Sequence, residues 1–106
     1  MGDMNMIVDA GACKFVTKIK AVPSEDCMSV TYVIDSDCPS VKNLASELGE
    51  LESMDIISTR ILDNALMKKC NELIPHPACI VPSALVKACE AACGFGVKKD
   101  ASLHFE

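Results

Sequence analysis

The sequence reads Val33-Ile34-Asp35-Ser36-Asp37-Cys38-Pro39-Ser40-Val41 at the point where an alternating strand pattern gives way to a helical one. Proline is favoured at the first position of a helix, where its missing N–H would have no partner in any case. With Pro39 there, Cys38 becomes the N-cap. Its sulfur would then face unpaired backbone N–H groups and the positive end of the helix dipole, and both favour the thiolate. Cys38 is therefore the first candidate for a metal ligand or a reactive thiol, and a buried cysteine at a turn is the alternative.

Three segments before this turn alternate between apolar and polar side chains, which is typical of strands with one buried face. They cover residues 4–9, 14–22 and 28–35. The turn residues Pro23-Ser24-Glu25-Asp26 separate the second segment from the third, which predicts an antiparallel hairpin.

Helical patterns follow the turn. Residues 39–48 place apolar side chains at spacings of three and four, and Gly49 is a natural stop. Residues 54–73 predict helix in one piece or two, with Ser58 or Asp63 as a cap for a second piece. The prolines around His76 end that pattern, and Pro82 opens a last helix that runs to about residue 93.

The end of the chain predicts one more strand, residues 101–105, with Ala101, Leu103 and Phe105 on its inner face. The expected fold is therefore one α+β domain over residues 1–106, with two layers. A mostly antiparallel sheet of about four strands is covered on one face by three helices. If the last strand lies inside the sheet, removing residues 100–106 should cost on the order of several kcal/mol.

Composition restricts the class of protein. The 106 residues carry a net charge of −5, which disfavours nucleic acid as a partner, because phosphate contacts need a basic face. No apolar run approaches the ~20 residues that span a bilayer, so no membrane contact is expected. The start of the chain does not read as a signal peptide, which predicts a cytoplasmic protein with reduced cysteines. No protein partner is indicated, and a homo-oligomer is left open.

The seven cysteines divide by position. Cys89 and Cys93 are four residues apart on an apolar helix face, which is typical of core side chains. Cys27 lies at the hairpin turn and is expected to be an incidental, partly exposed thiol.

The other four cysteines lie at turns and helix ends, and antiparallel strands bring alternate loops to one end of a sheet. Four thiolates are the ordinary ligands of structural zinc or of an iron–sulfur cluster. No C-x-x-C pair is present to strengthen this prediction. The candidate metal ligands are Cys13, Cys38, Cys70 and Cys79, with His76 as a substitute three residues before Cys79.

Three hypotheses on function remain open. The first is a small protein that binds zinc or an iron–sulfur cluster through these cysteines. The second is thiol, persulfide or sulfur-carrier chemistry at Cys38, with Cys13 or Cys79 as the resolving thiol. The third is an interaction module with neither metal nor catalytic site. The sequence has no phosphate-binding glycine loop and no nucleophile elbow, so no catalytic residue is assigned and enzyme activity is left open.

Three further segments stand out: Asp9-Ala10-Gly11-Ala12-Cys13-Lys14-Phe15-Val16-Thr17, Asp37-Cys38-Pro39 and His76-Pro77-Ala78-Cys79-Ile80-Val81-Pro82-Ser83-Ala84. They resemble a small cysteine-containing family of unknown function from anaerobic prokaryotes. The resemblance covers nearly the whole chain and implies no activity. In this chain Lys14 stands where the pattern of that family more often has glycine. The Cys-Pro element alone is similar to elements in proteins of iron–sulfur cluster assembly, by analogy only.

Overall fold

Alternation of apolar and polar side chains produces the three long strands of the computed structural model, which describes residues 2–106. Met4, Met6 and Val8 face the inner side of the first strand, as expected. All neighbouring strands are antiparallel, and the central strand pairs with both others along most of its length. The strands are β1 (Met4–Asp9), β2 (Val16–Pro23) and β3 (Ser29–Ser36).

The fourth strand is not the one that the sequence predicts. It is the two-residue β4 (Leu51–Glu52), which pairs with Ser29 and Val30 at the start of β3. Residues 97–106 contain no strand and are exposed throughout, so the prediction of a strand over residues 101–105 is wrong. Alternation makes a segment suitable for a strand, but a strand also needs hydrogen-bonding partners. The edge at β3 pairs with β4, and residues 97–106 do not pair with the edge strand β1.

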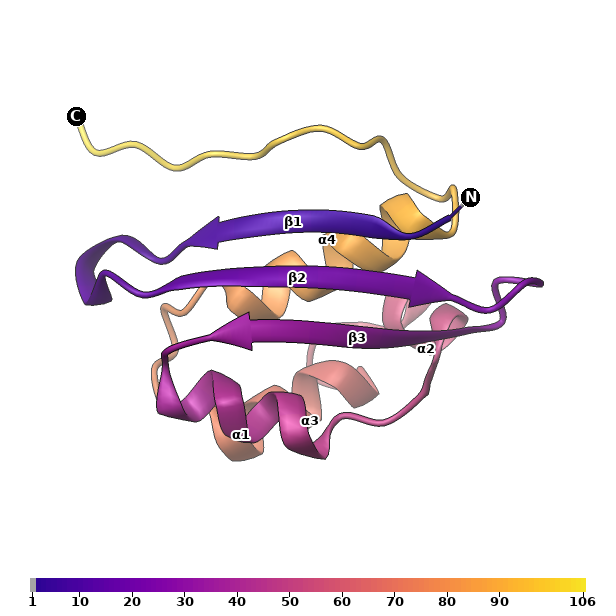
Figure 1. Ribbon diagram of the computed structural model, residues 1–106, viewed down its shortest axis with the longest axis horizontal. Coiled ribbons are helices and arrows are strands. Elements are labelled where there is room, and N and C mark those ends of the chain that lie inside the picture. Colours follow the sequence, from indigo (N-terminus) through magenta and orange to yellow (C-terminus); the bar gives the residue numbers. More distant parts are fainter. Residues whose placement is uncertain (1) are drawn as a thin grey trace.

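Four helices follow β3 and lie on one face of the sheet (Figure 1). Three of them have seven residues or more, as the sequence predicts, and α2 is shorter. The predicted helical region 54–73 is divided in two, and its second piece is capped by Asn64 rather than by Ser58 or Asp63. Asparagine competes for the same backbone N–H groups as those residues. The helices are α1 (Pro39–Glu47), α2 (Ser53–Ser58), α3 (Ala65–Leu73) and α4 (Val81–Ala92).

The core lies between the sheet and the helices. The helix α4 packs beneath β1 and β2, and α1 packs beneath β3. Aliphatic side chains and small residues fill this space, in keeping with the low aromatic content of 4%. Within residues 2–106 no helix is long and apolar enough to cross a membrane. The largest fully buried aliphatic side chains are Ile19, Leu44, Ile56, Leu66 and Leu85.

Candidate functional site

Cys38 occupies the predicted position at the start of a helix. It is the N-cap of α1, with an extended backbone at φ −70°, and Pro39 follows as the first helical residue. The Cys38 N–H donates to the Ser36 hydroxyl at 3.2 Å. The Cys38 side chain is half-buried, and among residues 2–106 its sulfur accepts no capping hydrogen bond from the helix. The predicted place of the thiol is therefore confirmed, whereas the predicted contact with the helix N–H groups is absent.

Ser36 anchors this turn, and no sequence pattern marked it as a functional residue. Its hydroxyl is buried and also accepts a hydrogen bond from the Thr17 hydroxyl at 2.8 Å. Thr17 and Ser36 are direct partners in the register of β2 and β3. A serine two residues before Cys38 in a turn is a signal for such a local bond to a backbone N–H. The Cys38 backbone is thereby tied to the paired ends of β2 and β3.

Cys13 lies in a tight loop between β1 and β2. The loop contains one short 3-10 helix, η1 (Gly11–Cys13). The Gly11 N–H donates to the Asp9 carboxylate at 3.0 Å, and the Lys14 N–H donates to the Gly11 carbonyl at 2.9 Å. Lys14 has φ +62°, a left-handed conformation in which glycine is favoured and other residues lose about 1 kcal/mol. Cys13 itself is exposed at the surface of the molecule.

Three of the predicted ligands, Cys13, Cys38 and Cys79, lie on loops at one end of the molecule. The register Asp9↔Val16 and Thr17↔Ser36 places the η1 loop beside the β3–α1 junction, which carries Cys38. The C-terminal end of α4 lies near the start of β1, because the Gly2 N–H donates to the Ala92 carbonyl at 3.2 Å. The opposite end of α4, which Cys79 precedes by two residues, therefore points toward the end of β1 and η1. Figure 1 shows these segments at the left of the molecule.

Cys70, His76 and Cys79 line one open hollow of about 440 Å³ between α3 and the start of α4. Cys70 is buried at 3% exposure, Cys79 is half-buried and His76 is exposed. Burial raises the pKa of the Cys70 thiol to about 11, and the nearby Cys79 thiol adds to the shift. The Cys79 N–H donates to the His76 carbonyl at 3.2 Å, which folds the connector into a turn. Two thiols and an imidazole thus share one solvent-accessible hollow.

The five predicted ligands do not form a ready metal site. Among residues 2–106, no group of three or more His, Cys, Asp or Glu side chains has an arrangement that could hold a metal ion. Cys13 and Cys38 are not among the described residues that line the Cys70 hollow. The described cysteines carry no disulfide. The predicted ligands are therefore divided: Cys70, His76 and Cys79 line this hollow, whereas Cys13 and Cys38 lie on loops at the end of the sheet.

A second group of thiols comprises Cys27, Cys89 and Cys93. Cys89 and Cys93 are buried, as the sequence predicts, and the Cys93 sulfur lies 3.6 Å from the Ser53 hydroxyl. Cys27 is half-buried, and its thiol contacts that of Cys93, so it is more than an incidental surface thiol. Burial is the main cause that raises the pKa of the Cys89 thiol to about 12, and the neighbouring Cys93 thiol adds to the shift. The same two causes raise the pKa of the Cys27 thiol. Such thiols stay protonated at neutral pH, which suits packing rather than catalysis.

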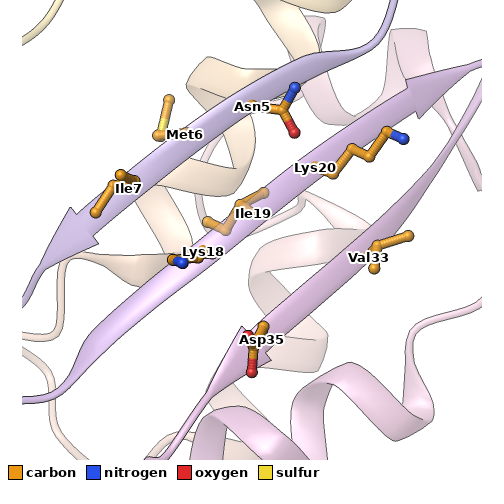
Figure 2. A pocket seen from close by; sticks show the side chains of 8 residues that line it. All are labelled: Asn5, Met6, Ile7, Lys18, Ile19, Lys20, Val33 and Asp35. Atoms are coloured by element: carbon orange, nitrogen blue, oxygen red, sulfur yellow. The ribbon is translucent and has the colours of Figure 1, made fainter.

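The uncovered face of the sheet carries a second hollow, of about 400 Å³ (Figure 2). The exposed side chains Ile7 and Val33 stand on its outer strands, at 70% and 61% exposure. Between them, Lys18 on β2 is the register partner of Asp35 on β3. None of the described residues that line this hollow is a cysteine or a histidine, and their mixed chemistry has no arrangement typical of catalysis.

The comparison with family models confirms the coarser part of the resemblance, which is a family of unknown function over nearly the whole chain. The model of a family of unknown function, DUF6951, matches residues 4–105. Searches of curated proteins and of solved structures found no match. The family match covers β1, every helix and the exposed segment after α4. This chain, with its antiparallel sheet, its cysteine-bearing loops at one end and its Cys70 hollow, belongs to the DUF6951 family of unknown function.

Proposed function

We propose that this protein binds a thiophilic metal ion, zinc in the first instance, through Cys70, Cys79 and His76. The observation that supports the proposal is that these three side chains line one hollow that is open to solvent. Two thiolates and an imidazole are ligand types that zinc prefers, and Cys₂His sets leave the fourth position for water or another donor. The exposed imidazole and the half-buried Cys79 thiol provide an entry path for the ion.

Small side-chain movements are required for this site. The hydrogen bond from the Cys79 N–H to the His76 carbonyl holds these two residues close along the chain, and closing the site would require rotations of their side chains and a shift of the exposed connector. Cys70 lies on the rigid α3 and supplies the fixed thiol. Metal ligands in proteins are often ordered only when the ion binds, because binding and local folding are coupled.

A larger site with Cys13 and Cys38 is the four-thiol form of the same proposal, and it suits zinc or an iron–sulfur cluster. It requires the η1 loop to move toward the start of α4. Cys13 is exposed, and the hydrogen bonds seen in its loop among residues 2–106 are local, which makes that movement easier than a change in the sheet.

The test is metal binding by protein that is purified without oxygen and stripped with a chelator. Titration with Co²⁺ should give a thiolate-to-metal charge-transfer band, and zinc should displace the cobalt and abolish the band. Cys79→Ser and Cys70→Ser should each weaken Co²⁺ binding about tenfold or more, because each removes a metal–sulfur bond. His76→Gln should weaken it as well, with His104→Gln, at another exposed histidine, as the matched control.

The remaining variants separate the three-ligand site from the larger one. Cys13→Ser and Cys38→Ser should leave cobalt binding unchanged if the Cys70 hollow holds the ion alone, and should abolish it if four thiols act together. A broad visible absorption after reconstitution with iron and sulfide would identify a cluster in place of zinc. Full cobalt affinity in both Cys70→Ser and Cys79→Ser would reject the proposal.

A second candidate function is thiol chemistry at Cys38. It is supported by the position of Cys38 as a half-buried N-cap, with its backbone held by Ser36 and its sulfur not engaged in capping. Limited alkylation of metal-free protein should then label Cys38 before the buried thiols Cys89 and Cys93. First labelling at either buried thiol would exclude this function.

A further inference from the structure

Residues 97–106 are an extended segment that lies outside the folded body. Figure 1 shows it running past β1 from the end of α4, and none of its residues is in a strand or helix. Its large apolar side chains are almost fully in water: Val97 is 82% exposed, Leu103 is 86% exposed and Phe105 is 107% exposed. A single exposed apolar residue is ordinary, but three in one short segment indicate a surface that is covered in another state.

The segment has the sequence of a strand. Ala101, Leu103 and Phe105 alternate with Ser102 and His104, so one face of the extended chain is apolar. The matched region of the family model reaches residue 105 and therefore includes this face. The segment belongs to the family domain rather than to an appended tail.

The same molecule carries an open strand edge. In the sheet order β1-β2-β3-β4, β1 is an edge strand. One side of β1 pairs with β2, and no strand among the described residues pairs with its other side. The inner face of β1 carries Met4 and Met6, which are partly buried against the core. An unpaired edge of this kind is a template for another strand. A strand added there with its apolar face inward would cover these methionines.

The turn after α4 fixes the direction in which the segment leaves. The Gly94 N–H donates to the Ala91 carbonyl at 3.3 Å, and the N–H groups of Phe95 and Gly96 both donate to the Glu90 carbonyl, at 2.9 and 3.1 Å. Gly94 has φ +76°, and a Cβ on Gly96 would lie 3.0 Å from the Glu90 Cβ. This closely packed turn sends residues 97–106 past the β1 edge without pairing to it.

We propose that residues 97–106 pair with the open β1 edge of a second copy of this chain. Every copy carries both an unpaired strand and an open edge, so two copies complete each other reciprocally in a two-fold dimer. The exchange places Leu103 and Phe105 beside the apolar inner side of the partner sheet. This dimer is independent of the proposed metal site, because none of the residues that line the Cys70 hollow takes part in it.

The experiment is sedimentation equilibrium of the chelator-treated chain over a wide range of protein concentration. The full chain should form dimers, and the double variant Leu103→Ser/Phe105→Ser should weaken dimerisation about tenfold or more. The matched control is Met28→Ser/Met54→Ser, which removes two other exposed apolar side chains, of 62% and 44% exposure, and should dimerise as the full chain does.

Hydrogen exchange identifies the pairing edge. Backbone amides of β1 that face away from β2 should exchange more slowly in the dimer than in the double serine variant. A full chain that is monomeric at every concentration overturns the proposal, and slow exchange in such a monomer would mean that the segment pairs with its own β1. Dimers of undiminished stability in the double serine variant would also overturn it.

Discussion

Cys89 shows how a buried thiol makes the stability of this protein depend on pH. It is 0% exposed, and its burial, together with the neighbouring Cys93 thiol, raises its pKa from an ordinary value of 9.0 to about 12. The folded state therefore favours the neutral thiol. Its contribution to stability is fully present below pH 9.0 and is lost as pH rises toward about 12.

The expected outcome is a free energy of unfolding that falls as pH rises above 9.0. Cys70, whose pKa is raised to about 11, contributes a fall in the same direction. The measurement is urea unfolding followed by circular dichroism at a series of pH values, for the wild type and for Cys89→Ala. The alanine variant should have a shallower fall, because it lacks one of the titrating thiols. An equal slope in both proteins would show that Cys89 does not titrate in this range.

At the scale of the secondary-structure element, the start of α3 depends on one buried amide. The Asn64 side chain accepts hydrogen bonds from the N–H groups of Leu66 and Met67, at 3.0 and 3.2 Å. Its NH₂ group donates to the Ile56 carbonyl at 2.7 Å. Asn64 is 2% exposed, so these bonds are protected from water. The same side chain thus caps α3 and connects it to α2.

Asn64→Ala should therefore lower the free energy of unfolding by about 2–4 kcal/mol, which combines a lost cap with a buried carbonyl that loses its donor. Asn71→Ala is the matched control, because Asn71 is exposed on the same helix, and its effect should stay within about 0.5 kcal/mol. Urea unfolding of the three proteins measures the difference. Equal stabilities of Asn64→Ala and Asn71→Ala would contradict the role of the Asn64 amide.

At the scale of the whole molecule, the folded body is expected to be independent of its last ten residues. Residues 97–106 are exposed and contribute no side chain to the buried core. In solutions dilute enough for monomers, a chain that lacks them should unfold with a free energy within about 0.5 kcal/mol of the full chain. This outcome reverses the expectation that the last strand lies inside the sheet.

Thermal and urea unfolding at increasing protein concentration complete this test. If residues 97–106 act between copies, stability should rise with concentration for the full chain but not for the shortened one, because dimerisation stabilises only the folded state. A loss of several kcal/mol in the dilute shortened chain would mean that these residues pack on their own domain.

Local sequence determined most elements of the fold. Period-two alternation was sufficient for β1, β2 and β3, because each has one face on the core and one in water. Pro39 and Pro82 marked the first turns of α1 and α4, since proline restricts the backbone at any site. The sequence alone therefore determined the α+β class, the three long strands and the place of Cys38 at a helix start.

Tertiary structure decided what depends on partners distant in sequence. The segment 101–105 alternates as well as β1 does, yet it forms no strand, because alternation does not decide whether a segment pairs with a sheet edge. The two-residue β4 pairs with β3 instead. Spacing could not show that Cys70, His76 and Cys79 share a hollow while Cys13 and Cys38 lie elsewhere. Such distances follow from how helices pack on the sheet, and packing sums many weak contacts that no short stretch of sequence contains.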